Sequence, residues 1–197
     1  MKVLNYAVKF FLIYFSLVTS SFSVGPSEFI NSISIEASEI LTSKLSETEK
    51  VSKLKMIAEE SVDIDGVGLY TLGKYRKTLT NEQKEEYKKL FREYFLKSFS
   101  GRLVVYNDAK IAVISEEVKN EKYTIVYSKL IGTTDRPEVK IDWRVYTKDP
   151  ENPLIRDLVI EGLSLARTQK EEFNSIIANN GGDIEALFEN LNKFLEN

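Results

Sequence analysis

The chain has 197 residues with 27 basic and 30 acidic side chains, a formal net charge of −3 at pH 7, and it contains neither cysteine nor histidine. These absences exclude disulfide bonds, cysteine nucleophiles, catalytic triads built on histidine, and zinc or iron sites with histidine ligands. An enzyme with this composition would have to work with carboxylates, Ser–Lys pairs or tyrosines. The acidic balance also disfavours nucleic acid as a partner.

The N-terminus is predicted to be a cleavable secretory signal. Lys2 and Lys9 stand before an apolar run, Phe10–Val18, which small residues follow. The run is much shorter than the ~20 residues that a membrane-spanning helix needs, so an uncleaved anchor is the weaker alternative. Ser21 and Ser23 form the small-x-small pattern that precedes a cleavage site, which predicts a signal peptide over residues 1–23.

The remaining residues, 24–197, are predicted to form a single domain. Loss of two lysines with the signal leaves a net charge of −5, so the mature chain is acidic. Its length is enough for a sizeable apolar core. No long linker rich in Pro, Gly or Ser divides it.

Four helices are predicted before the first strand. Apolar residues at helical spacing indicate the first, Pro26–Leu45. The second, Ser46–Val62, opens with a Ser-x-x-Glu capping box. Asp63 or Asp65 can cap a short third helix, and the fourth, Thr80–Tyr106, opens with a Thr-x-x-Gln capping box.

The fourth predicted helix carries the strongest apolar stripe in the chain. Its members recur every three or four residues: Tyr87, Leu90, Phe91, Tyr94, Phe95, Phe99 and Leu103. The opposite face is charged and therefore faces solvent. Ordinary core packing is the simplest interpretation of any single ring in this stripe.

After Asn107 the apolar period changes from helical to two, which predicts strands. The predicted strands are residues 111–118, 123–127, 139–146 and 155–161. The third is the clearest, because four apolar residues alternate with polar ones: Val139, Ile141, Trp143 and Val145. One face of the sheet is therefore expected to be buried and the other wet. Short turns, the first at Asn120 and Glu121, give an antiparallel meander.

Two helices are predicted after the sheet. Gly162 ends the fourth strand, Ser164 can cap the next helix, and Gly181 and Gly182 stop it. Asp183 can cap the last helix. The predicted fold class is therefore α+β, with a curved antiparallel sheet of about four strands and N-terminal and C-terminal helices packed on one face.

Carboxylate chemistry has one candidate cluster. Four charged residues fall on neighbouring predicted strands: Asp142, Arg144, Asp157 and Glu161. An ion-pair ladder on the exposed sheet face is the simpler interpretation of this cluster. Adjacent acidic pairs elsewhere point in different directions and are interpreted as surface charges. The sequence contains no complete calcium loop and no complete nucleotide-binding motif, so no metal and no cofactor is expected.

Several segments together resemble one known family. These are Leu72–Lys77 (LGKYRK), Thr80–Gln83 (TNEQ), Phe91–Phe95 (FREYF), Ile160–Leu165 (IEGLSL) and Gly181–Leu187 (GGDIEAL). Their order and spacing are similar to those of the MlaC or toluene-tolerance family. No single motif is decisive, but the set is specific.

The resemblance covers Phe29–Phe194, which is most of the chain. It implies a periplasmic, monomeric, non-enzymatic carrier that shuttles phospholipid between an outer-membrane MlaA complex and an inner-membrane Mla ABC transporter, maintaining outer-membrane lipid asymmetry. It also implies an apolar cavity for the acyl chains between the helices and the curved sheet, with the head group near solvent. Tyr75 and Pro153 depart from the family pattern, which blurs the expected shape of the pocket.

A carrier of this kind must bury the acyl chains that the membrane otherwise keeps away from water. A lipid with roughly thirty methylenes would lose on the order of 20 kcal/mol on leaving a membrane alone, so nonspecific apolar contacts are expected. The expected lining residues are Leu72, Leu90, Tyr94, Phe95, Val139, Ile141, Trp143 and Leu163. Each could equally belong to a sealed core. Two alternatives remain: an enzyme that uses Asp142 and Asp157, and an interaction module without a ligand.

Overall fold

The structure is a computed structural model that describes residues 24–104, 110–133 and 137–197. The helices are α1 (Pro26–Thr42), α2 (Glu47–Ser61), α3 (Ile64–Thr71), the 3₁₀ helix η1 (Tyr75–Lys77), α4 (Asn81–Leu103), α5 (Leu165–Asn179) and α6 (Glu185–Glu196). The strands are β1 (Ile111–Asn120), β2 (Tyr123–Leu130), β3 (Val139–Tyr146), β4 (Leu154–Ile160) and β5 (Leu163–Ser164). The predicted signal, 1–23, and the predicted end of the fourth helix at Tyr106 lie outside the described residues.

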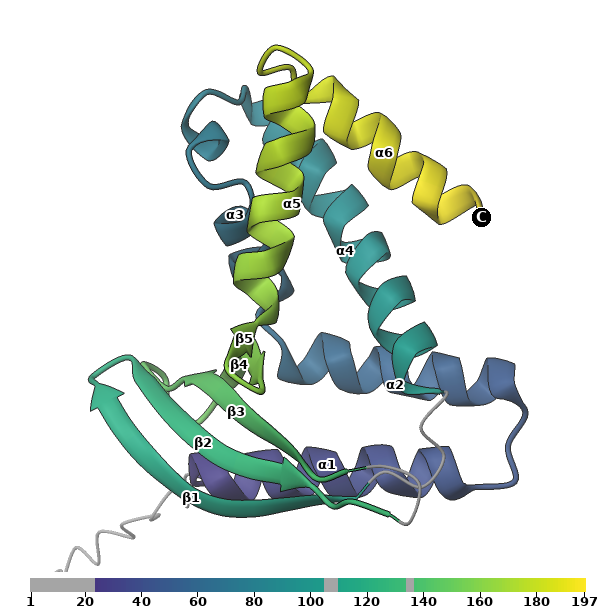
Figure 1. Cartoon of the computed structure of the whole chain (residues 1–197), viewed down its shortest axis with the longest axis vertical. Helices are drawn as coiled ribbons and strands as arrows, with labels where there is room; N and C mark the ends of the chain where they lie inside the picture. Colours follow the sequence, from purple (N-terminus) through teal and green to yellow (C-terminus); the bar gives the residue numbers. More distant parts are fainter. Residues whose placement is uncertain (1–23, 105–109, 134–136) are drawn as a thin grey trace, which may run out of the picture.

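The strands form one antiparallel sheet in the order β1-β2-β3-β4-β5. The α+β class and the curved antiparallel meander are confirmed, with five strands where about four were expected (Figure 1). The additional strand is only two residues long, too short for a periodicity of two to reveal it. Register shifts in β1 and between β3 and β4 mark bulges, which increase the local bend and twist of a sheet.

The capping signals in the sequence set the starts of the helices. Both predicted capping boxes are present, at Ser46 and at Thr80. Asp63 caps α3 by accepting from the backbone N–H of Gly66 at 2.9 Å. Ser164 caps α5 as predicted. The predicted cap of the last helix is displaced by one residue, since the N-cap of α6 is Ile184 and the carboxylate of the preceding aspartate accepts from the N–H of Glu185.

The α1–α2 hairpin joins the sheet to the rest of the helices. Figure 1 shows the sheet and α1 at one end of the molecule, α3, α4, α5 and α6 towards the other, and α2 between them. Helix α1 packs on β1 and β2, whereas α2 packs on α1 and α4; α5 packs on β4. Helices from both ends of the chain therefore contact the sheet. The first turn of α1 is also tied to β1, because the backbone N–H of Ser27 donates to the carboxylate of Glu116 at 2.8 Å.

The apolar core is continuous from the α3, α4, α5 and α6 end to the sheet. Its largest fully buried members include Tyr87 of α4, Phe173 of α5 and Leu187 of α6, together with Val126 and Val145 of the sheet. Within the described residues, every buried polar side-chain atom has a hydrogen-bond partner. The fold therefore carries no buried orphan polar side chain in its described part.

The predicted ion-pair ladder is confirmed in one ion pair, but the prediction that its side chains are exposed is wrong for Asp157. Arg144 Nη1 lies 3.2 Å from Asp157 Oδ2 across β3 and β4, as the ladder requires. Asp157, however, is buried, because β5 and the first turn of α5 cover it: it accepts from the Ser164 hydroxyl at 2.6 Å and from the Ala166 N–H at 3.0 Å. Glu161 does not join the ladder and instead accepts from a backbone N–H.

Candidate functional site

Four aromatic rings one helical turn apart form a ladder along α4: Tyr87, Phe91, Phe95 and Phe99. Successive ring centres are 5.7, 6.2 and 5.7 Å apart. Tyr87 and Phe91 are fully buried, but Phe95 and Phe99 are only half-buried. The first two rings of the ladder therefore belong to the closed core, and the last two rings are only partly covered.

The face of the sheet that carries Trp143 shows the same gradient of burial. At its closed end, Val126 and Val145 are fully buried. At the other end, the register aligns Ile111, Leu130 and Val139 in one row across β1, β2 and β3, and all three are half-buried. The next row continues through Ile141 and Ile160 to Leu163, and its last member is 58% exposed.

The two partly uncovered regions are neighbours along the chain. Only residues 104–109 separate the last residue of α4 from the residue before β1, so the Cα atoms of these two residues are at most about 25 Å apart. Both regions also pack against the same core cluster. We call this half-buried apolar surface the open surface and define it by these residues: Phe95, Phe99, Ile111, Leu130, Val139 and Leu163.

The predicted lining residues fall into three groups. Leu72, Leu90, Ile141 and Trp143 lie in the closed core. Phe95, Val139 and Leu163 belong to the open surface. Tyr94 lies elsewhere, in the contact between α4, α5 and α6. Whether any of the eight contacts a ligand stays a prediction. The sequence reasoning left Phe99 out of the site, although its i, i+4 spacing from Phe95 was the available signal.

Tyr94 is fixed by its contacts with the last two helices. Its ring centre lies 5.6 Å from that of Phe173 and 4.8 Å from that of Phe194. Its hydroxyl donates to Gln169 Oε1 at 2.8 Å. Burial, and secondly the nearby charge of Glu172, raises the pKa of the Tyr94 hydroxyl, so the ring stays neutral through the physiological range. Its position indicates a structural contact between helices.

Trp143 carries a polar atom into the apolar face of the sheet, where that atom is satisfied. Its indole N–H donates to the Ser128 hydroxyl at 2.8 Å, and that hydroxyl donates to the backbone carbonyl of Ile141 at 3.0 Å. The pair leaves no free donor towards the apolar side. The apolar part of this face, which includes the row of Ile111, Leu130 and Val139, is therefore suited to hydrocarbon.

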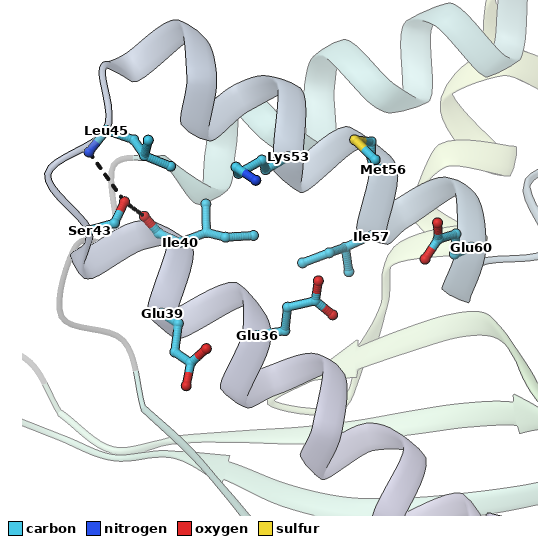
Figure 2. Close-up of a pocket in the computed structure, with 9 residues that line it drawn as sticks. All are labelled: Glu36, Glu39, Ile40, Ser43, Leu45, Lys53, Met56, Ile57 and Glu60. Atoms are coloured by element: carbon cyan, nitrogen blue, oxygen red, sulfur yellow. Dashed lines mark hydrogen bonds between the residues drawn. The ribbon is translucent and has the colours of Figure 1, made fainter.

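A second feature is a groove of about 310 Å³ between α1 and α2 (Figure 2). It is lined by Glu36, Glu39, Ile40, Ser43, Leu45, Lys53, Met56, Ile57 and Glu60. Its volume is at the lower end of ligand pockets, which span about 300–1,000 Å³, and three carboxylates border it. It is consequently not a place for lipid acyl chains. The sequence reasoning missed it, because helix periodicity does not show how two helices lie against each other.

No group of three or more acidic side chains in the described part of the chain is placed to hold a metal ion. Across residues 24–104, 110–133 and 137–197, no helix combines the length and apolarity needed to cross a membrane.

Comparison with known proteins gives two consistent results. The chain is similar in structure to a phospholipid-binding protein from Ralstonia solanacearum that was solved in complex with a phospholipid: the TM-score is 0.71 at 18% sequence identity, and the match covers 86% of this chain and 96% of the other. At this identity the likeness establishes the shared fold. In sequence, the family model described as MlaC protein matches residues 32–193. The match spans most of the chain, and this protein therefore belongs to the MlaC family.

Proposed function

We propose that residues 24–197 form a single-domain periplasmic phospholipid carrier, released from a signal peptide over residues 1–23. In this proposal the protein takes up phospholipid at one envelope membrane and delivers it at the other, between an outer-membrane MlaA complex and an inner-membrane Mla ABC transporter. The exchange maintains outer-membrane lipid asymmetry. Membership of the MlaC family supports this function, as does the fold shared with a protein solved with a bound phospholipid.

The observation that carries the proposal is the open surface. Large aromatic and aliphatic side chains such as Phe95, Phe99 and Val139 are half-buried against the core, and Leu163 is 58% exposed. Each Å² of apolar area removed from water contributes about 25 cal/mol, so covering this surface with acyl chains is favourable. The contacts are hydrocarbon to hydrocarbon and lack a polar lock. Such contacts bind acyl chains of different lengths and compositions. They release the lipid when a partner buries the same apolar surface.

The same region supports a binding function over catalysis. Asp157, which the enzyme alternative requires, is occupied by Arg144, Ser164 and the N–H of Ala166. A carboxylate with all of these partners positions the start of α5 and has little freedom to act as a base. We therefore propose that the protein binds phospholipid as cargo and performs no reaction on it.

The test is organic extraction of protein purified from the periplasm, followed by mass spectrometry. The proposal expects phospholipid at close to one molecule per protein. Val139→Glu and Leu163→Glu place a charge in the open surface and should abolish co-purification. Val118→Glu is the matched control, because Val118 is 70% exposed on β1 and lies outside the open surface. Circular dichroism verifies that each variant is folded.

Three outcomes contradict the proposal. Folded Val139→Glu and Leu163→Glu variants that keep their lipid would remove the open surface from the site. Wild-type protein that is empty and tightly packed would favour an interaction module without a ligand. Turnover of a substrate that is lost in Asp142→Asn or Asp157→Asn would favour the enzyme.

A further inference from the structure

The groove between α1 and α2 combines an apolar floor with an acidic border. Figure 2 shows Ile40 of α1 and Ile57 of α2 pointing towards each other across the groove, with the carboxylate of Glu36 beside them. Glu39 and Glu60 lie along its edges, and Lys53 is the only cation in its lining. The groove therefore presents a net negative charge around hydrocarbon.

The charges around the groove are available to a partner. None of the ion pairs in the described part of the chain involves Glu36, Glu39, Glu60 or Lys53. Helix α1 also contains no lysine or arginine, so its only charged side chains are the carboxylates of Glu28, Glu36 and Glu39. Unpaired carboxylates on both sides of a groove attract cations and repel lipid phosphates.

Two large apolar side chains of α1 and α2 are exposed. Met56 is 56% exposed and lies in the lining, and Ile35 of α1 is 51% exposed. Methionine adapts its shape to different apolar partners and is common on surfaces that receive helices. Exposed apolar residues bordered by charge mark interaction sites.

We propose that this groove docks an amphipathic helix of a partner protein whose polar face is basic. The apolar side of that helix packs on Ile40, Met56 and Ile57, and its lysines or arginines pair with Glu36, Glu39 and Glu60. Helices recognised in grooves use this combination of apolar anchors and flanking charge. The site is separate from the open surface, so the proposal does not depend on phospholipid transport.

The probe is a synthetic, fluorescently labelled peptide of leucine and lysine with the leucines at helical spacing. Its binding to the full mature protein is measured by fluorescence anisotropy at low and at physiological salt. The proposal expects saturable binding that weakens with salt. A peptide with glutamate in place of lysine should not bind, and a peptide of the same composition with scrambled order should bind at least about tenfold more weakly.

Two triple variants separate the effect of the groove carboxylates from the effect of the protein's net negative charge. Glu36→Gln, Glu39→Gln and Glu60→Gln combined should weaken binding about tenfold, as three exposed charge pairs predict. The control triple, Glu86→Gln, Glu121→Gln and Glu189→Gln, removes the same charge at other exposed sites and should change binding less than about twofold. All six positions are exposed. Met56→Ser tests the apolar part and should also weaken binding.

Several results would overturn the proposal. Equal losses in both triple variants, or equal binding of the ordered and scrambled peptides, would show attraction by net charge alone. Co-flotation of the wild-type protein with phosphatidylcholine vesicles in the absence of peptide, if it is lost in Met56→Ser, would make the groove a membrane contact. Amide hydrogen exchange supplies the location: slower exchange in α1 and α2 on peptide addition supports docking there, whereas slower exchange confined to other helices contradicts it.

Discussion

The indole N–H of Trp143 donates to the hydroxyl of Ser128 at 2.8 Å, joining β3 to β2 by side chains inside the apolar face of the sheet. Both residues are buried. The hydroxyl passes the interaction on to the carbonyl of Ile141, so three polar groups are satisfied together. A large ring is thereby held in one orientation, in the row next to that of Ile141, Ile160 and Leu163.

Ser128→Ala should destabilise the protein by about 1–3 kcal/mol, because it leaves the buried indole N–H without an acceptor. Urea denaturation followed by tryptophan fluorescence measures the change, since Trp143 is the only tryptophan of the chain. Ser52→Ala on the exposed side of α2 is the control and should change stability by less than about 0.5 kcal/mol. An unchanged midpoint for Ser128→Ala would mean that the indole N–H finds another partner or water.

The aromatic ladder should separate stability from lipid binding. Phe91→Ala removes a fully buried ring and should cost about 3–5 kcal/mol. Phe99→Ala removes a half-buried ring and should cost about half of that or less, while lowering the phospholipid extracted per folded protein. Denaturation midpoints and a phosphate assay on extracts give the two quantities. If Phe99→Ala keeps its full lipid content, the outer rung of the ladder is not in contact with the cargo.

Asp63 should stabilise the junction between α2 and α3 in two ways. Its carboxylate caps α3 and also accepts from Arg156 Nε at 2.6 Å, while the Arg156 guanidinium stacks 3.6 Å from the ring centre of Tyr146. Asp63→Ala removes the cap and the ion pair and should cost about 2 kcal/mol. Asp63→Asn keeps a capping acceptor and should cost about half as much. Equal losses in the two variants, measured by urea denaturation, would show that the cap contributes nothing.

Tyr87 predicts a loss of stability in alkaline solution. Burial raises the pKa of its hydroxyl above the ordinary value, and the hydrogen bond with Thr71 only partly opposes this. Because the unfolded tyrosine ionises near pH ~10 and the folded one does not, the contribution is complete below that pH. It is lost as the pH rises above it, with a slope that approaches about 1.4 kcal/mol per pH unit.

Tyr87→Phe removes that contribution and serves as the comparison. Its stability should fall less steeply than that of the wild type between pH 10 and 11, by about 1 kcal/mol, because the unfolded tyrosine is only half ionised at pH 10. Urea midpoints at pH 9, 10 and 11 measure both proteins under the same conditions. Parallel decreases in the two proteins would show that Tyr87 ionises as readily in the folded state as in the unfolded one.

Much of the fold follows from local signals in the sequence. Both capping boxes, the Asp63 cap and the period-two pattern of β3 predict elements that the structure contains. Errors occur at element ends: the first helix was predicted to reach Leu45 but ends at Thr42. The buried state of Asp157 was also missed, because its cover comes from the first turn of α5 and tertiary packing is not encoded in strand alternation.

The sequence predicts which apolar residues of the candidate site face inward, but it does not predict which of them remain partly exposed. Apolar periodicity identifies Leu72 and Val139 alike as inward-facing, although one is fully buried and the other half-buried. The difference depends on what covers each side chain in the assembled fold, which periodicity does not show. The groove between α1 and α2 has the same origin. The resemblance to the MlaC family predicted that the ligand is a phospholipid. The residues alone did not indicate which ligand is bound.

The α1–α2 hairpin has a mechanical consequence. One leg is packed on β1 and β2 and the other on α4, and a short connection joins them. Any change in the spacing between α4 and the sheet must therefore alter the angle between the two legs. If the protein carries phospholipid as proposed, a bound molecule that moves α4 relative to the sheet would change the angle between α1 and α2, and the empty and loaded forms would differ in outer shape.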